Sequence, residues 1–216
     1  MGERLGRSFY RADASDLATR LLGQRLVRIL DDGTRLAGLI HETEAYLGVE
    51  DAASHAYRGR RTARNEGMYA REGTAYVYFT YGMHFCMNVV AGRVDHPHAV
   101  LIRALLPEEG LERMLENRGG KEPLCKGPAR LCKALGIDGA MNLQDLVEGE
   151  RLFIERGMSV PPRGRVACPR VGIGQEGEWV VKPLRWYVRE SPWVSVRDRA
   201  AEGAAGLKGQ GRKCRR

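Results

Sequence analysis

Two pairs of strand-like segments, each joined by a tight turn containing glycine, most strongly constrain how this chain folds. The pairs are residues 24–30 with 35–47, joined by Asp31-Asp32-Gly33-Thr34, and residues 74–80 with 83–91, joined by Tyr81-Gly82. An Asp-Gly turn between apolar segments is a strong signal of a β-hairpin, and aromatic and β-branched residues favour strands. The pattern therefore predicts antiparallel hairpins as the basis of the fold.

Other segments add strands and short helices to these hairpins. We expect strands at 99–106, 151–155, 165–171 and 178–188, and helices at 15–22, 107–118, 128–135 and 141–148. Asp13 or Ser15 caps the first helix, Pro107 is the first residue of the second, and Gly136 ends the third. Hairpins with scattered helices predict an α+β fold and not a doubly wound parallel sheet.

The length of 216 residues, 43% of them hydrophobic, fits one domain with a sizeable core. No change in composition marks a domain boundary before residue 200. Beyond it the apolar periodicity is lost and basic residues gather. We therefore expect one folded domain over residues 1–200 and a basic, disordered tail over 201–216.

The formal net charge is +8, which favours a polyanionic partner such as nucleic acid about as strongly as a basic enzyme with a small substrate. The five cysteines are odd in number and form no CxxC pair, so no disulfide framework or zinc ribbon is predicted. The sequence shows no apolar run of about 20 residues and no signal-peptide core. We expect a soluble protein inside the cell.

One strand carries an unusual set of acidic and aromatic residues. Glu42, Glu44 and Tyr46 alternate along it and so share one face. A carboxylate beside an aromatic ring suits a pocket wall with a base. Taken alone, the segment fits solvent-facing charges on a half-exposed strand better.

The second hairpin gathers three tyrosines and an asparagine. Tyr76 and Tyr78 share a face, Tyr81 lies at the turn and Asn88 follows in the return strand. Tyrosine rings stack on nucleobases, and a tyrosine at a hairpin tip suits a wedge in DNA. An aromatic core strand is the plainer alternative, and Asn88 either bonds locally or reads a substrate.

Two further motifs give weaker evidence of function. Gly172–Gly177 matches the dinucleotide pattern GxGxxG, but Pro183 follows too early for the required helix, so a flexible loop is the better interpretation. His96 and His98 have no supporting ligand cluster, which favours a polar loop over a metal site.

Several long motifs, in the same order from about residue 5 to residue 199, resemble the alkyladenine (3-methylpurine) DNA glycosylase family. They are ETEAYLG (42–48), Ser54-His55, TxRNxGM (62–68), YVYFTYGMHFCMN (76–88), LIRALLPxEG (101–110), GPxRLCxAL (127–135), RVGIG (170–174) and KPLRWYVRxSPWVS (182–195). The resemblance implies a curved, mainly antiparallel sheet surrounded by short helices.

The resemblance also implies roles for individual residues. Glu44 activates the attacking water, and Arg103 lies near that water and the DNA backbone. Base-binding residues are Tyr46, His55 and Tyr78, which clamp the flipped base, and Asn88, which excludes guanine. Tyr81 is inserted into the duplex. The remaining DNA-binding positions are Arg64, Met68, Met83, Val171 and Gly172.

The implied reaction is that of a monofunctional DNA glycosylase in base-excision repair. Alkylated or deaminated purines (3-methyladenine, 7-methylguanine, hypoxanthine, ethenoadenine) are flipped out of double-stranded DNA, and the N-glycosidic bond is hydrolysed, leaving an abasic site. No metal or cofactor and no membrane are expected to take part. We expect a monomer, cytoplasmic and nucleoid-associated in a bacterium or nuclear in a eukaryote. The alternatives are a DNA-binding module without turnover and a nucleotide-dependent oxidoreductase.

Overall fold

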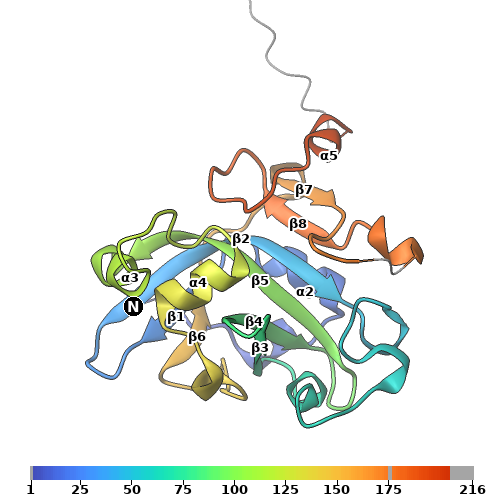
Figure 1. Ribbon diagram of the computed structural model, residues 1–216, viewed down its shortest axis with the longest axis horizontal. Coiled ribbons are helices and arrows are strands. Elements are labelled where there is room, and N and C mark those ends of the chain that lie inside the picture. Colours follow the sequence, from blue (N-terminus) through green and yellow to red (C-terminus); the bar gives the residue numbers. More distant parts are fainter. Residues whose placement is uncertain (1, 175–176, 205–216) are drawn as a thin grey trace, which may run out of the picture.

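Both predicted hairpins are present in the computed structural model, which describes residues 2–174 and 177–204. Within these residues eight strands form one curled antiparallel sheet, in the order β3-β4-β5-β2-β1-β6, with β8 paired to β2 and β7 to β8. The strands are β1 (Arg25–Ile29), β2 (Arg35–Tyr46), β3 (Ala75–Thr80), β4 (His84–Ala91), β5 (His98–Glu109), β6 (Leu152–Glu155), β7 (Arg165–Cys168) and β8 (Arg185–Val188). The α+β expectation is confirmed (Figure 1).

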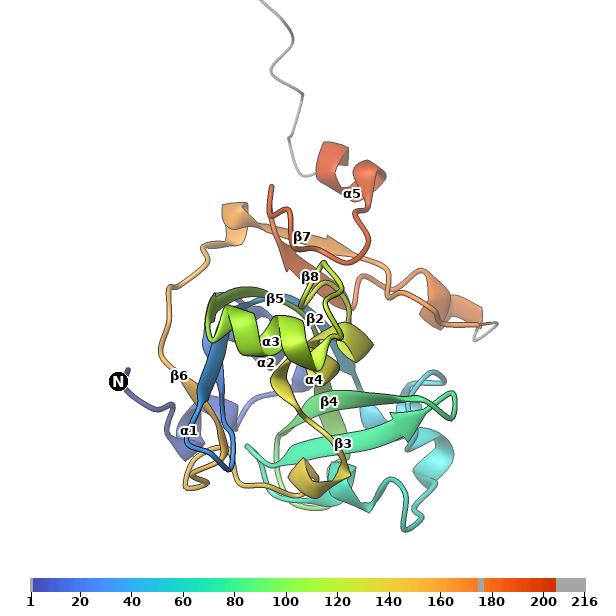
Figure 2. The same ribbon diagram turned by 60° about the vertical axis from the view of Figure 1, so that its left-hand side comes forward.

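The long strand β2 is the centre of the sheet. Along one edge it pairs with β5, while its other edge is shared. Residues 35–39 pair with β1, and Glu42–Glu44 pair with β8. The β7–β8 pair and the last helix, α5 (Arg199–Ala204), therefore lie together over the second half of β2, as Figure 2 shows.

An extra residue in β2, His41, changes the direction in which the later side chains of the strand point. Ile40 and Ala45 both belong to the main hydrophobic core, although an odd spacing would put them on opposite faces of a regular strand. His41 is an extra residue of β2 between the pairs Ile40–Leu105 and Glu42–Ala104, and Arg103 is a compensating extra residue of β5 before the pair Thr43–Ile102. A bulge adds one residue to one strand and so restores both side chains to the core face. It also leaves Glu42, Glu44 and Tyr46 on the other face, as predicted.

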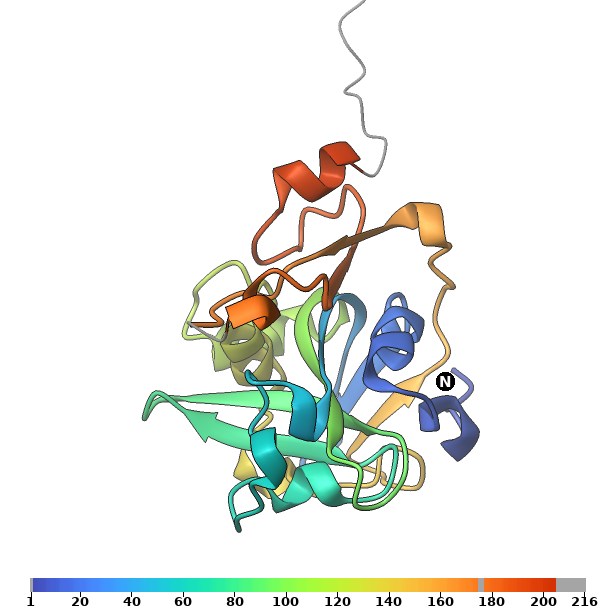
Figure 3. The ribbon, with the colours of Figure 1, turned by 90° about the vertical axis from the view of Figure 1, so that its right-hand side faces the viewer.

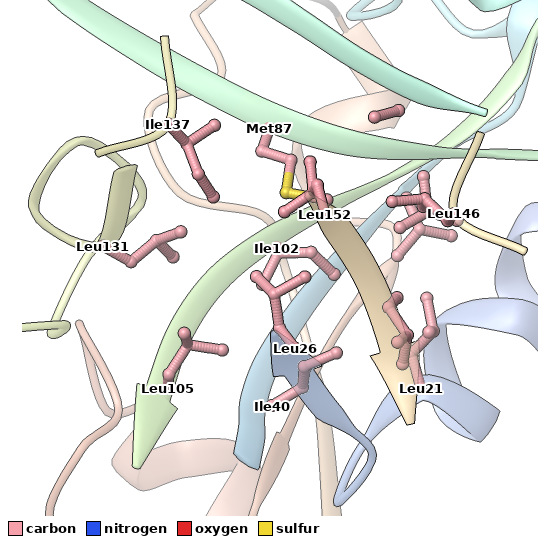
Figure 4. Packing of buried hydrophobic residues seen from close by; sticks show 14 of the residues in the cluster. Leu21, Leu26, Ile40, Met87, Ile102, Leu105, Leu131, Ile137, Leu146 and Leu152 are labelled. Atoms are coloured by element: carbon pink, nitrogen blue, oxygen red, sulfur yellow. The ribbon is translucent and has the colours of Figure 1, made fainter. Parts of the chain in front are cut away.

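The core fills the space between the curled sheet and two helices, α2 (Ala14–Leu21) and α4 (Pro128–Leu135). Figure 4 shows Leu26, Ile40, Ile102 and Leu105 from three neighbouring strands, which belong to the same core cluster as Leu131 of α4. Burying such a side chain contributes about 1.5–3 kcal/mol. The packed core therefore stabilises the curled shape of the sheet.

Helix α4 has the predicted bounds, and α2 begins at Ala14 and ends at Leu21, one residue earlier at each end than predicted. The Asp13 carboxylate accepts a hydrogen bond of 2.9 Å from the Asp16 amide and so caps α2. Pro128 opens α4, and Gly136, with φ of 62°, ends it in the left-handed conformation. Two other α-helices, α1 (Arg7–Tyr10) and α3 (Leu111–Asn117), are short.

The helix predicted to begin at Pro107 begins only at Leu111. Strand β5 continues to Glu109, with Pro107 opposite Gly38 of β2. A Cβ atom on Gly38 would lie 2.7 Å from the Leu106 carbonyl oxygen, so the glycine permits this close pairing. The chain then turns at Gly110, where φ is 74°, and only there does α3 begin.

The helix predicted at 141–148 is also absent from the described chain. Its place is taken by a short 3-10 turn, Gly139–Met141, and by a turn segment that is bonded to β3 and holds Leu143 in the left-handed conformation, with φ of 66°. Leu143 donates its amide to the Ala75 carbonyl, and Ala75 donates to the Gln144 carbonyl. Pairing with β3 outweighed the local helical pattern.

The later strands are shorter than predicted. The segment 165–171 is a strand only as β7, to Cys168, and 178–188 contains a 3-10 turn (Gly177–Val180) before β8. Of the tail expected at 201–216 to be disordered, residues 201–204 belong to α5, and 205–216 lie outside the described residues.

Cys86, Cys125, Cys132 and Cys168 are buried free thiols, as expected, and Cys214 lies outside the described residues. No helix in the described part of the chain has the length and hydropathy needed to cross a membrane.

Candidate active site

A cavity of about 370 Å³ opens between the β3–β4 hairpin, β5 and the segment after β7. Nine predicted site residues line it: Tyr46, His55, Met68, Tyr78, Tyr81, Asn88, Arg103, Val171 and Gly172. The other three, Glu44, Arg64 and Met83, are not part of its lining. The fold thus brings together residues that are as far apart in sequence as 46 and 172.

Glu44 lies directly behind the cavity wall and is fully buried. Its Oε1 accepts a hydrogen bond of 2.7 Å from the Val171 amide. Its Oε2 accepts one of 3.0 Å from the Tyr46 hydroxyl and lies 3.2 Å from Arg103 Nη1. The solvent-facing alternative for this carboxylate is therefore wrong.

The charge of Glu44 alters its neighbours. Burial and the adjacent Glu44 charge raise the pKa of Tyr46, so its hydroxyl stays protonated and donates. Burial acts to lower the pKa of Arg103, but the carboxylates of Glu44 and Glu42 outweigh it and raise that pKa. Arg103 is therefore a permanent cation against Glu44.

Glu42 is equally buried but is bonded to different partners. Its Oε1 accepts from Arg185 Nη1 at 2.8 Å and from the Ser195 hydroxyl at 2.9 Å. Its Oε2 accepts from the Ser195 amide at 2.6 Å. Arg103 Nε approaches Oε1 at 3.3 Å, so Arg103 joins the two carboxylates.

A second buried ion pair supports the cavity from behind. Arg170 and Asp51 are both fully buried and form a two-pronged pair of 2.5 and 2.8 Å. Arg170 also donates to the Ala45 carbonyl and lies over the Tyr46 ring, 4.8 Å from its centroid. It thereby ties the segment that carries Val171 to the strand that carries Glu44.

No sequence motif assigned a specific role to five polar residues around Glu44, which are the buried Glu42, Asp51, Arg170 and Arg185 and the partly buried Ser195. Charged residues in otherwise apolar strands were the available signal, because a buried charge requires a partner. Arg185 between Leu184 and Trp186 is such a case. The partners could not be paired from sequence, since Glu42 and Ser195 are 153 residues apart.

Aromatic side chains form the walls of the cavity. His55 and Tyr78 meet edge to face with ring centroids 4.6 Å apart, and Tyr76 lies 5.3 Å from Tyr78. The Tyr76 hydroxyl and His55 Nδ1 are 2.9 Å apart. Burial and the nearby Arg64 and Arg60 lower the pKa of His55, so its ring is neutral at pH 7. The core and pocket interpretations of this strand both hold, because Tyr76 is buried yet lines the cavity.

Asn88 is almost fully buried in β4 and also lines the cavity. Its Nδ2 donates a hydrogen bond of 3.1 Å to the Tyr76 carbonyl. This bond fixes the amide plane, so the local-bond and cavity interpretations are compatible.

Tyr81 stands at the tip of the β3–β4 hairpin, which projects from the body of the protein (Figure 3). Tyr81 is 84% exposed, and Met83 close to it is 68% exposed. Two aromatic or apolar side chains displayed to this degree at one tip are free to enter another surface. Tyr81 has φ of 50°, a left-handed conformation that the tight turn with Gly82 requires.

The basic loop between β2 and β3 lies beside the cavity. Arg64 donates to the Phe79 carbonyl and forms no ion pair with a described carboxylate. Arg61 is paired with Glu66 and Asp95, and Arg71 with Asp145. Arg64 is therefore more available to bind an anion than Arg61 or Arg71, which are already paired with carboxylates.

The described residues of the two weaker motifs form neither a dinucleotide site nor a metal site. After Gly177 the chain makes a 3-10 turn and leads to β8, without the helix that a dinucleotide pyrophosphate needs. No group of three or more His, Cys, Asp or Glu side chains in residues 2–174 and 177–204 is arranged to hold a metal ion, which leaves His96 and His98 without further ligands.

The chain matches one protein family and is similar to mammalian proteins. Residues 8–192 match the family model described as methylpurine-DNA glycosylase (MPG). The chain is 49% identical over 211 residues to the human protein named DNA-3-methyladenine glycosylase, covering 92% of this chain and 70% of that protein. It is 49% identical to the mouse protein of that name, covering 63% of the mouse protein.

A bacterial relative matches over its whole length. The protein named putative 3-methyladenine DNA glycosylase from Desulfitobacterium hafniense is 42% identical over 209 residues, which cover 90% of this chain and 100% of that protein.

Proposed function

This chain belongs to the methylpurine-DNA glycosylase family, and from that premise we propose that it hydrolyses damaged purines from double-stranded DNA with a water activated by Glu44. The enzyme class follows from the family itself: a DNA glycosylase, which is a hydrolase of N-glycosyl bonds in DNA repair. The substrates, the catalytic water and the roles of individual residues are the proposal.

One observation carries the proposal: the buried Glu44 carboxylate shares its contacts with three groups of the cavity wall, Tyr46, Arg103 and the Val171 amide. Cleavage of an N-glycosidic bond builds positive charge on the sugar. A fixed carboxylate stabilises that charge and takes a proton from water. Each carboxylate oxygen can accept two hydrogen bonds, and Oε1 accepts only one from the described residues. We assign the attacking water to this free position.

The aromatic walls suit the proposed substrates. A cavity of about 370 Å³ is within the usual range for small ligands, about 300–1,000 Å³. An alkylated purine is cationic, and tyrosine faces such as those of Tyr46 and Tyr78 attract a cation. The neutral ring of His55 adds a third wall without repelling it.

Asn88 is proposed to reject undamaged guanine. Its amide is held by the Tyr76 carbonyl and cannot rotate away from an incoming base. The exocyclic amino group that distinguishes guanine would then meet a fixed side chain. Adenine-derived lesions lack that group.

The exposed hairpin tip is proposed to open the duplex. Tyr81 would fill the gap left by the flipped nucleotide, with Met83 against the neighbouring base step. Arg64, beside the cavity and without a described carboxylate partner, would contact phosphate and set position but not sequence. Met68, Val171 and Gly172 line the cavity where the flipped nucleotide would lie. We propose that the enzyme acts on DNA as a monomer.

The test is an excision assay on duplexes that each carry one lesion, beginning with hypoxanthine, with an undamaged duplex as the control. We expect release of the free base and an abasic site that breaks only on treatment with alkali. Strand cleavage before alkali, or no release from any alkylated or deaminated purine, would contradict the proposal.

A further inference from the structure

We propose that Glu42 and Ser195 are positioning residues for the reaction, because together they hold the Arg103 guanidinium in place against Glu44. The inference rests on the proposed function and deepens it. Neither residue belongs to the lining of the cavity, and Ser195 lies beyond residue 192, where the family match ends.

The contacts of Glu42 differ from those of Glu44 in how few of them reach the cavity. Glu42 is fully buried and accepts from Arg185, from both the amide and the hydroxyl of Ser195, and from Arg103. Of these partners only Arg103 lines the cavity, whereas Tyr46, Arg103 and Val171, which contact Glu44, all line it. Its role must therefore be exerted on its partners.

The partner that reaches the cavity is Arg103. Its Nε lies 3.3 Å from Glu42 Oε1, its Nη2 lies 3.3 Å from the Ser195 hydroxyl, and its Nη1 lies 3.2 Å from Glu44 Oε2. A guanidinium is planar, so two contacts fix the direction of the third. Glu42 and Ser195 thus decide how Nη1 meets Glu44.

The charges lead to the same conclusion. Two guanidinium groups, Arg103 and Arg185, and two carboxylates, Glu42 and Glu44, are buried within contact of one another. Without the Glu42 charge, both cations would be balanced by Glu44 alone. The carboxylate that is meant to stabilise a cationic sugar would then be partly neutralised by its own surroundings.

The segment after β8 is part of this arrangement. Ser195 lies in this segment. The segment is held against β8 by Arg185, whose Nη1 donates a hydrogen bond of 2.7 Å to the Val196 carbonyl. The Ser195 hydroxyl donates to Glu42 and accepts from Arg103, so it links the two side chains directly. A hydroxyl, and not merely a small side chain, is required at this position.

The first test is Glu42→Gln, which keeps the shape but removes the charge. We expect the single-turnover excision rate on a hypoxanthine duplex to fall about 10- to 100-fold, since small misplacement of a catalytic contact has that effect. Binding to a duplex with an abasic-site analogue should stay within about threefold of the unmodified protein.

The matched control is Glu155→Gln. Glu155 is also a buried carboxylate of the same sheet, 2.7 Å from Arg35, but lies on β6 at the end of the strand order. The Glu155→Gln variant should have a lower melting temperature but the same excision rate as the unmodified protein. If Glu42→Gln excised as fast as this control, the inference would be overturned.

The second test does not depend on Glu42→Gln folding. Ser195→Ala should slow excision about tenfold, as the loss of the linking hydrogen bonds predicts, and Ser195→Thr, which retains the hydroxyl, should restore most of the rate. Equal rates for the two variants would refute the inference while leaving the proposed function standing. Absence of excision by the unmodified protein would instead refute both.

Discussion

Replacing Asp51 by Asn should destabilise the protein strongly, because it leaves a buried cation without its counter-charge. Asp51 and Arg170 are both fully buried, and Arg170 has no described carboxylate partner other than Asp51. Asn keeps the size of the side chain, so the change isolates the charge. The Leu47 and Ala53 amides, which donate to the Asp51 carboxylate, would also lose part of their acceptor.

The expected loss in the free energy of unfolding is about 3–5 kcal/mol, the cost of breaking a buried pair by removing one partner. A domain of this size loses about 2–4 °C of melting temperature per kcal/mol, which gives a decrease of roughly 6–20 °C. Excision should fall as well, because Arg170 precedes the Val171 amide that donates to Glu44 and lies over the Tyr46 ring.

Urea unfolding followed by circular dichroism measures this loss. Asp31→Asn is the matched control, since Asp31 pairs with Arg151 while 83% exposed, and its change should stay within about 1 kcal/mol. If Asp51→Asn cost no more than Asp31→Asn, the reasoning that the buried pair supports the site would be refuted.

Three other changes have distinct expected results. Tyr81→Ala should leave the melting temperature unchanged, because the side chain is exposed, yet lower excision from paired duplex about tenfold or more relative to single-stranded DNA; equal losses on both substrates would exclude a wedge. Asn88→Ala should raise the release of undamaged guanine, measured as free base from unmodified duplex, and no increase would show that the amide does not select. Burial lowers the pKa of His41, His55 and His98, whereas the unfolded chain binds these protons from about pH 6.5 downward. The free energy of unfolding should therefore decrease as the pH falls below 6.5, and urea melts showing constant stability from there to pH 5.5 would contradict the assignment.

The local elements could be predicted where residues at their ends determine them. The turns at Gly33 and Gly82 and the helix from Pro128 to Gly136 are set by backbone conformations that glycine and proline favour. The start of α3 was misplaced because proline suits a helix start in isolation, whereas here pairing with β2 carries Pro107 into a strand. Tertiary pairing, which local sequence does not record, decided that case.

The site could be predicted only in part for a similar reason. The motif around Glu44 indicated a pocket, but the strand pattern alone favoured an exposed carboxylate. Its burial depends on Arg103 and on the Val171 amide, which comes from a segment 127 residues later. The link from Glu42 to Ser195 spans a still longer separation. Such contacts exist only after the β7–β8 pair has folded against β2.

The central claim, that Glu44 activates the water, is tested most directly by single-turnover excision with Glu44→Gln at saturating enzyme. The account predicts a rate about 100- to 10,000-fold below that of the unmodified protein, with binding to abasic-site DNA retained. A Glu44→Gln variant that released hypoxanthine at the unmodified rate would contradict it.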